Sequence, residues 1–352
     1  MKTLGDFDWG YYLENFKGAG RWSVIVKDPS KVLAKDFKLP KGYCLKIFKD
    51  TTWQGTSFGE ALIIKNIAWI NGFAPRARGM ITLGEGNHEF TAFILEFVKN
   101  NQTLEEKRAL IKTRSVLFKQ MLADNFITSY QNEHGEIVYN ASNWRDGLYL
   151  DFGGFQIDKE KYKEKLVKEI IEVTHFGKAY LGGKASYQSV PEWKLDGKRK
   201  TDYRIEQLGL EKQEFKGKSV LDIGCNLGML LHYAKKRGAK ELFGYDFPNV
   251  IKVAKEFANI NLLFDLDFFG QDLTANPPDA KADIVFYLAM SEYLGFPNWL
   301  REVTKETLYY EGHANEDKNE TEGKLRKLFA DVSFLGYTED RSIRPLFVCR
   351  NV

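Results

Sequence analysis

Apolar and polar residues in the second half of the chain alternate between strand-like runs and helix-like segments. Residues 219–223 (SVLDI) form a short apolar run that is typical of a buried strand. Residues 229–237 (MLLHYAKKR) carry apolar residues at helical spacing, and Gly238 ends that pattern. Residues 224–228 (GCNLG) lie between the two, so the sequence predicts a strand, a tight glycine turn and the start of a helix.

The same alternation continues to the end of the printed sequence. The predicted strands are 219–223, 241–246, 260–269, 282–288, 307–310, 332–337 and 345–349. The predicted helices among them are 229–237, 249–257, 299–304 and 325–329. Strands that alternate with helices and end in a hairpin predict an α/β fold with a doubly wound, Rossmann-like sheet of about seven strands.

The first half of the chain predicts a smaller α+β domain. Its strand-like runs are 22–27, 32–37, 43–49, 79–83 and 89–97, and a helical pattern covers 59–71 after the third run. A Lys/Glu-rich helix at 159–173 precedes the second half. We therefore predict a first domain over residues 1–158, a helical linker over 159–186 and a second domain over 187–352.

Composition narrows the class of protein only slightly. The 352 residues are 43% hydrophobic and 28% charged, which is ordinary for a globular protein. The net charge of +3 permits an anionic substrate but does not require nucleic acid. The three cysteines are scattered, and neither a signal peptide nor an apolar run of membrane-spanning length stands out. The sequence predicts a cytoplasmic protein without disulfides or bound metal, and it leaves the oligomeric state open.

The turn after the strand at 219–223 carries the most specific motif of the chain. Gly224 and Gly228 are four residues apart, and Asp222 precedes them. This spacing differs from the G-x-G-x-x-G of dinucleotide-binding turns, and the Lys-Ser/Thr of a phosphate loop is missing. An acid at the strand end suits a cationic or hydroxyl-rich ligand better than a pyrophosphate.

The string VLDIGCNLG resembles the first motif of class I methyltransferases that use S-adenosylmethionine (SAM). The resemblance implies that Asp246, at the end of the second strand, accepts hydrogen bonds from the ribose hydroxyls of SAM, and that Phe247 packs on the adenine. It further implies that Asp272 accepts from the adenine amino group and that Leu288 lies near the methyl group. The turn would contribute Asp222, Gly224, Cys225, Asn226 and Gly228.

The second half also resembles the methyltransferase part of the bifunctional kinase–methyltransferases that cap bacterial O-antigen polysaccharides. The shared features are Tyr187-Gln188, Arg204 ahead of the first strand, and an Arg-Pro-Leu-Phe string at 344–347. The resemblance implies that Tyr187, Gln188 and Arg204 contact SAM, and that the acceptor is a saccharide or another small molecule. The domain order differs, because that family places its methyltransferase first.

The order of elements in the first half resembles the small lobe of protein kinases. Lys46 then corresponds to the lysine that holds nucleotide phosphates, Glu60 to its ion-pair partner, and Asp151-Phe152-Gly153 to the metal-binding motif. A glycine-rich loop and a His-Arg-Asp motif are missing, so the resemblance implies a degenerate domain without kinase activity. The alternative is that Lys46 and Glu60 form a surface ion pair and that Asp151 belongs to a chance tripeptide.

Two residues beyond the fifth predicted strand are candidates for proton transfer. His313 has the side chain best suited to act as a base near neutral pH, and Glu311 is the second candidate. Their alternatives are a loop histidine and a strand-end cap. We predict a SAM-dependent methyltransferase that acts on a hydroxyl, phosphate or amine of a small-molecule or glycan-like acceptor. Its rivals are an RNA methyltransferase that uses the basic segment 197–204 and a non-catalytic, SAM-binding assembly protein.

Overall fold

The computed structural model forms two compact units. It describes residues 23–26, 39–48, 57–83, 90–99, 101–129, 141–173, 185–314, 316–339 and 343–351. The first unit comprises Met1–Lys163 and Asn259–Phe264, and the second comprises Glu164–Ala258 and Asp265–Val352.

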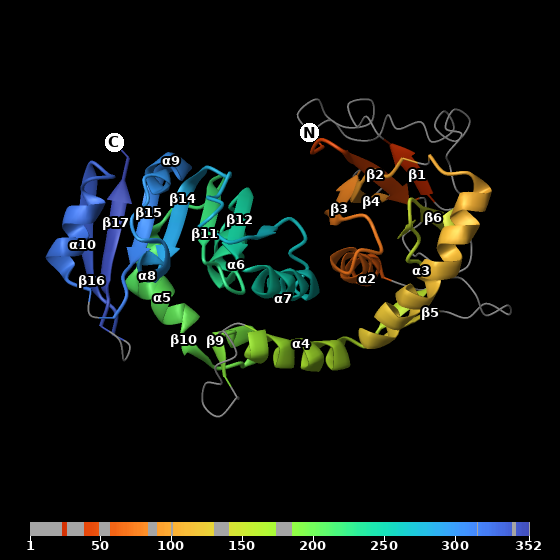
Figure 1. The fold of residues 1–352 in the computed structure, drawn as a ribbon, viewed down its shortest axis with the longest axis horizontal. Coiled ribbons are helices and arrows are strands. Elements are labelled where there is room, and N and C mark those ends of the chain that lie inside the picture. The colour runs from red at the N-terminus through yellow and green to blue at the C-terminus, as the bar shows by residue number, and fades with distance from the viewer. Residues whose placement is uncertain are drawn as a thin grey trace. The chain divides into compact units, whose positions relative to one another are not determined.

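The first unit contains a four-stranded antiparallel sheet with the strand order β1-β2-β4-β3 (Figure 1). Its strands and helices are β1 (Ser23–Val26), β2 (Tyr43–Phe48), α2 (Phe58–Ile70), β3 (Ala77–Leu83), β4 (Phe90–Glu96), α3 (Leu104–Asp124), β5 (Ile127–Ser129), β6 (Trp144–Arg145), β7 (Leu148–Tyr149), β8 (Phe155–Ile157) and the start of α4 (Lys159–Val173). A 3₁₀ helix covers Ala141–Asn143.

Helix α2 is fixed to this sheet by apolar packing and by one buried amide. Ser57 caps its N-terminus by accepting a hydrogen bond from the Glu60 backbone N–H. Leu62 packs in one cluster with Phe48 and Phe93 of the sheet. The side chain of the buried Asn66 exchanges two hydrogen bonds of 2.9 Å with the backbone of Ala77, at the start of β3. These bonds satisfy a buried polar group and set the position of the helix along the sheet.

The second unit contains seven strands in the order β13-β12-β11-β14-β15-β17-β16 (Figure 1). Its strands are β9 (Ser186–Gln188), β10 (Gly197–Arg199), β11 (Ser219–Ile223), β12 (Glu241–Asp246), β13 (Asp267–Gly270), β14 (Ala282–Leu288), β15 (Thr304–Glu311), β16 (Asp331–Tyr337) and β17 (Pro345–Arg350). Its helices are α5 (Thr201–Gln207), α6 (Met229–Lys236), α7 (Pro248–Ile260), α8 (Ser291–Leu294), α9 (Trp299–Val303) and α10 (Lys318–Leu325), with 3₁₀ turns at Pro191–Trp193 and Leu210–Lys212. Strands β9 and β10 pair with each other outside the large sheet.

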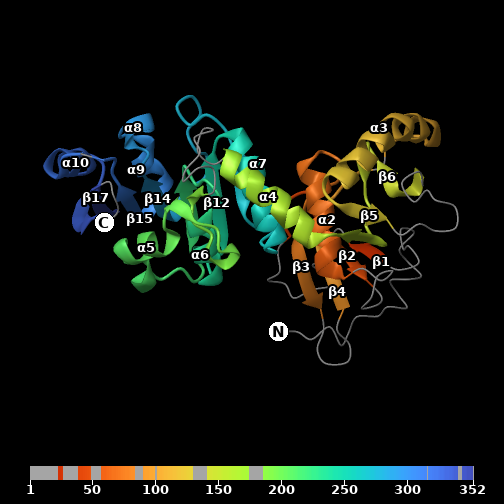
Figure 2. The ribbon, with the colours of Figure 1, turned by 90° about the horizontal axis from the view of Figure 1, so that it is seen from below.

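Helices cover both faces of the seven-stranded sheet. Figure 2 shows α5 and α6 on one side of the strands and α8 and α9 on the other. The central strand β11 is buried at all five residues, which is typical of a parallel strand with two covered faces. Only β17 runs antiparallel to its neighbours β15 and β16. The predicted doubly wound sheet of seven strands is therefore confirmed.

Several predicted element boundaries are wrong. The strand predicted over 260–269 is limited to β13, because α7 continues to Ile260 and a turn follows it. The helix predicted over 325–329 is α10, which starts earlier because the Asp317 side chain caps the Glu320 N–H. Helix α3 was not predicted, although Thr103 and Glu106 form a capping box at its start. The predicted strand 32–37 lies outside the described residues.

Candidate cofactor and acceptor site

A cavity of about 630 Å³ opens at the carboxyl ends of the parallel strands in the second unit. Ligands of open α/β sheets bind at this edge, where strand ends and loops meet. The cavity is lined by residues at or after the ends of β11, β12, β13, β14 and β15. Residues from α4, β9, β10 and α5 and the residue before β17 complete the lining. It is therefore built from almost the whole length of the unit.

The glycine turn forms one wall of the cavity. Gly224 has a φ of +75°, and a Cβ at this position would lie 2.3 Å from Met290 Sδ. Gly228 has a φ of +73°, and its Cβ would lie 2.8 Å from the ring of Phe268. The left-handed φ favours glycine at both positions, as the sequence motif predicted, and a Cβ at either one would displace a neighbouring side chain.

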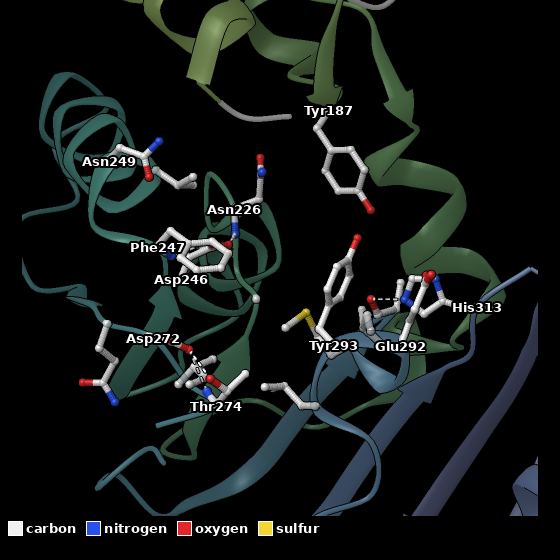
Figure 3. A pocket seen from close by; sticks show the side chains of 18 of the residues that line it. Tyr187, Asn226, Asp246, Phe247, Asn249, Asp272, Thr274, Glu292, Tyr293 and His313 are labelled. Atoms are coloured by element: carbon white, nitrogen blue, oxygen red, sulfur yellow. Dashed lines mark hydrogen bonds and ion pairs between the residues drawn. The ribbon is translucent and has the colours of Figure 1, made fainter. Parts of the chain in front are cut away.

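Asp246 lies beside the glycine turn at the end of β12 (Figure 3). Its Oδ2 accepts a hydrogen bond of 2.8 Å from the Asn226 backbone N–H, and its Oδ1 accepts one of 2.7 Å from the Phe247 N–H. Burial raises the pKa of this carboxyl above its ordinary value, and the two N–H groups act in the opposite direction. Each carboxylate oxygen can accept a second hydrogen bond, so Asp246 can also bind a ligand with two hydroxyls.

Phe247, Asn249 and Asp272 lie at the same end of the cavity as Asp246 (Figure 3). The ring of Phe247 is 43% exposed, so it offers an apolar face to a flat ligand. Asp272 Oδ1 accepts bonds from the Thr274 N–H and hydroxyl, at 2.9 and 2.7 Å. Those bonds lower the pKa of Asp272, so the residue is an ionised acceptor at neutral pH.

The opposite end of the cavity is formed by two tyrosines and an acid–histidine pair. The side chains of Tyr187 and Tyr293 point toward one another across the cavity (Figure 3). Glu292 Oε2 lies 2.8 Å from Nδ1 of His313, and Nε2 of the same ring lies 2.6 Å from the Ala289 carbonyl oxygen. A carbonyl oxygen only accepts, so Nε2 donates to Ala289, and Nδ1 faces the Glu292 carboxyl.

Glu311 occupies a different place from His313. It is 1% exposed and is not among the residues that line the cavity. Its carboxylate accepts from Arg204 Nε and Nη2 at 2.9 and 3.2 Å and from Arg344 Nη1 at 3.1 Å, and Arg199 Nη2 lies 3.9 Å away. Glu311 is thus an acceptor for guanidinium groups.

The structure brings most of the predicted cofactor residues to the cavity. Those that line it are Tyr187, Arg204, Gly224, Asn226, Asp246, Phe247, Asp272 and Leu288. The other four predicted cofactor residues, which are Gln188, Asp222, Cys225 and Gly228, do not line the cavity. Of these, Gln188 donates to the Cys225 carbonyl at 3.4 Å, and burial raises the pKa of Asp222 to about 7.

Sequence reasoning did not single out several lining residues, and Asn249, Val250, Leu273 and Thr274 are among them. Thr274 had a local signal, because a threonine two residues after an aspartate commonly bonds back to it. The other three line the cavity only through tertiary packing, so no sequence pattern marks them.

In the first unit, the predicted partner of Lys46 differs from the observed one. Lys46 Nζ lies 3.8 Å from Asp151 Oδ1, whereas Glu60 Oε1 accepts a bond of 2.9 Å from the Ile157 backbone N–H. The buried Lys65 lies nearby and donates to the Leu150 carbonyl oxygen at 3.4 Å. Phe152 is fully buried in an aromatic cluster with Phe118, Tyr149 and Phe155.

Two further findings concern the described part of the chain as a whole. None of its helices combines the length and the apolar composition that a membrane span needs. Within the same residues, no group of three or more histidines, cysteines, aspartates and glutamates is placed to hold a metal ion.

Comparisons with known proteins concern the second unit of the chain. Residues 221–306 match the family model of a methyltransferase domain. Protein arginine N-methyltransferase 1 of Saccharomyces cerevisiae is 34% identical over 104 residues, which is 29% of each chain. The chain thus spans under a third of this relative's length.

Two solved structures are also similar. Magnesium protoporphyrin IX methyltransferase of Synechocystis PCC 6803 with bound SAM has 19% identity and a TM-score of 0.36, over 43% of this chain and 77% of that one. The bifunctional kinase–methyltransferase WbdD has 21% identity and a TM-score of 0.38, over 47% of this chain and 43% of that one. The family match does not reach the first unit, so the kinase-like assignment stays a prediction. Residues 221–306 thus lie in a methyltransferase domain within the Rossmann-like second unit.

Proposed function

We propose that the chain is a SAM-dependent methyltransferase in which one cavity holds the methyl donor and the acceptor. The observation that carries the proposal is that the glycine turn and Asp246 share this cavity with Glu292 and Tyr293. Asp246 would accept hydrogen bonds from the ribose hydroxyls, and Phe247 would pack beside the adenine. A donor bound in this way leaves the end with Glu292 and Tyr293 for the acceptor.

In this proposal Glu292 accepts the proton of the acceptor, and His313 positions Glu292. Methyl transfer from a sulfonium is a displacement that depends on close positioning and, for a hydroxyl acceptor, on loss of a proton. The Ala289 carbonyl oxygen and the Glu292 carboxylate engage both ring nitrogens of His313, so this proposal gives the role of base to Glu292 rather than to His313, the base expected from the sequence. The Glu292 side chain is 67% exposed and can receive a proton.

The proposed acceptor is a hydroxyl or amine of a small molecule or saccharide. A nitrogen of a protein side chain is the second candidate, because Glu292 places a carboxylate at the acceptor end and the yeast relative is named for protein arginine. RNA is less well supported, since Arg199 and Arg204 of the basic segment are buried around Glu311 rather than exposed to phosphates.

The test is calorimetric binding of S-adenosylhomocysteine to the full chain. We expect the change Asp246→Ala to weaken binding at least about 30-fold, because two hydrogen bonds to a charged acceptor are lost. The control is Asp331→Ala, which removes an exposed carboxylate of the same sheet that pairs with Arg350. That variant should bind like the unmodified protein.

Equal affinity of the Asp246→Ala variant and the unmodified protein would contradict the proposed site. Acceptor classes are then compared by transfer of labelled methyl from SAM to separate pools of saccharide, arginine- and lysine-containing peptide, and RNA. Cofactor binding without transfer to any pool would favour the non-catalytic assembly protein.

A further inference from the structure

Helix α3 of the first unit (Figure 2) carries a second cavity, which the proposed methyltransferase function does not use. The cavity has a volume of about 310 Å³. It is lined by Arg108, Ile111, Lys112, Ser115 and Val116. These positions follow the helical spacing i, i+3, i+4, i+7 and i+8, so their side chains share one face of the helix. We call this space the α3 cavity.

One residue of the α3 cavity presents a buried hydroxyl group. Ser115 is 0% exposed, and its Oγ has no hydrogen-bond partner in the part of the chain that the structure describes. A serine inside a helix commonly bonds back to the carbonyl oxygen one turn earlier, and Ser115 lacks this bond. A buried hydroxyl without a partner is costly for folding. The α3 cavity therefore contains a donor that is left for a ligand.

Positive charge surrounds this hydroxyl group. Arg108 and Lys112 line the α3 cavity, and within the described residues neither has an ion-pair or hydrogen-bond partner. Residues 107–119 contain five lysines and arginines and no acid. The acids of the first turn are Glu105 and Glu106, and the Glu106 carboxylate is engaged in the capping box. Even when the exposed Glu105 is counted, two cations face one carboxylate, so the lining keeps a net positive charge.

We propose that Arg108, Lys112 and Ser115 form a phosphate-binding site on α3. A phosphate group carries a charge of roughly −2 at neutral pH, which two cations match. The guanidinium group binds two phosphate oxygens through paired N–H donors, the ammonium group binds as a point charge, and the hydroxyl group donates to a third oxygen. The site lies in the first unit and does not depend on the proposed function.

The phosphate group comes from one of two sources, a soluble phosphate compound or the headgroup of an anionic lipid. Val116 is 64% exposed beside the two cations. An exposed aliphatic side chain next to basic residues contacts the apolar part of a lipid surface, whereas it contributes nothing to binding of a free phosphate. Val116 therefore distinguishes the two sources.

The first experiment titrates inorganic phosphate into the full chain at constant ionic strength. Binding is followed by amide hydrogen exchange in peptides from α3, which phosphate should slow. The change Arg108→Gln should weaken binding at least about tenfold, because a charge-assisted pair of hydrogen bonds is lost. The matched control is Lys107→Gln, which removes the same charge from α3 outside the lining and should change the affinity about twofold at most.

The change Ser115→Ala separates binding from folding. The variant loses a donor to the ligand, so it should bind phosphate at least about threefold more weakly. Because the hydroxyl group has no partner in the ligand-free chain, the variant should unfold at the same temperature as the unmodified protein or at a higher one. A lower unfolding temperature with unchanged phosphate binding would contradict the role of Ser115 in the site.

The second experiment identifies the source of the phosphate group. The full chain is sedimented with phosphatidylcholine vesicles that contain or lack phosphatidic acid. If the source is a lipid headgroup, the protein sediments only with the vesicles that contain phosphatidic acid, and both Arg108→Gln and Val116→Ser reduce the bound fraction. If the source is a soluble compound, the protein binds inorganic phosphate and sediments with neither kind of vesicle.

Two results would overturn the proposal. In the first, the unmodified chain binds neither inorganic phosphate nor vesicles with phosphatidic acid. In the second, Arg108→Gln and Lys107→Gln bind phosphate alike, which would reduce the effect to the overall charge of the helix. Hydrogen exchange of α3 without phosphate should be equal in the variants and the unmodified chain, which shows that the helix is intact.

Discussion

Each unit of the chain places an acid beside basic residues, and the two arrangements differ in burial and in distance. In the second unit, Glu311 is almost fully buried and accepts three hydrogen bonds from arginines. In the first unit, the Asp151 side chain is 37% exposed and lies 3.8 Å from Lys46, too far for a hydrogen bond. One is a tight arginine–carboxylate cluster and the other is a loose lysine–aspartate pair.

The difference shows how lysine and arginine respond to burial. The guanidinium group stays protonated and offers several donors in a plane, so it can satisfy a buried carboxylate from two sides. A buried ammonium loses its hydration and releases its proton more easily. Burial, together with the charge of the neighbouring Lys46, lowers the pKa of Lys65 to about 7. The first unit therefore contains a lysine that titrates near neutral pH.

The largest expected effect comes from removing Glu311, the acid that accepts hydrogen bonds from both Arg204 and Arg344. The change Glu311→Gln should lower the free energy of unfolding of the second unit by about 3–5 kcal/mol, because buried guanidinium groups lose their counter-ion. Amide hydrogen exchange in peptides from β15 measures this loss.

A matched control lies on the same strand. Glu306 is 48% exposed and pairs with Lys218 at 2.6 Å, so Glu306→Gln should cost about 1 kcal/mol or less. Similar small losses in both variants would contradict the view that burial separates Glu311 from an ordinary surface pair.

Lys65 provides the next prediction, which concerns pH. The unfolded chain binds more protons than the folded chain between the folded pKa of about 7 and the ordinary value of 10.5. The free energy of unfolding of the first unit should therefore rise with pH, by about 2–3 kcal/mol from pH 7 to pH 9. The charged groups that act on Lys65 are Lys46, Asp151, Cys44 and Glu96.

Hydrogen exchange in peptides from α2, measured over a series of pH values, checks this dependence of the unfolding free energy on pH. The change Lys65→Met removes the titrating group and should flatten the dependence on pH, whereas Lys112→Met, at an exposed position of α3, should leave it unchanged. If the unfolding free energy of Lys65→Met rose with pH as steeply as that of the unmodified protein, the titrating group would be another residue.

The comparison also separates what the sequence could and could not predict. The glycine turn was predictable, because Gly224 and Gly228 follow a buried strand at a short fixed spacing. Asp246 was predictable from its place at a strand end. The shared contact of Arg204 and Arg344 with Glu311 was not predictable, since the two arginines are 140 positions apart in the sequence and meet only in the folded unit. Glu311 and His313 are two positions apart in the sequence. Only the folded structure shows that Glu311 is buried away from the cavity whereas His313 lines it.

The smallest expected effect comes from Asp151, the counterpart of Glu311 in the first unit. A partly exposed carboxylate 3.8 Å from its partner contributes little, so Asp151→Asn should change the unfolding free energy by about 1 kcal/mol or less. Its charge nevertheless raises the pKa of both Lys46 and Lys65. The rise in stability with pH should therefore begin at a lower pH in Asp151→Asn, as hydrogen exchange over a pH series measures. An unshifted profile together with a loss as large as that of Glu311→Gln would show that the two clusters are alike after all.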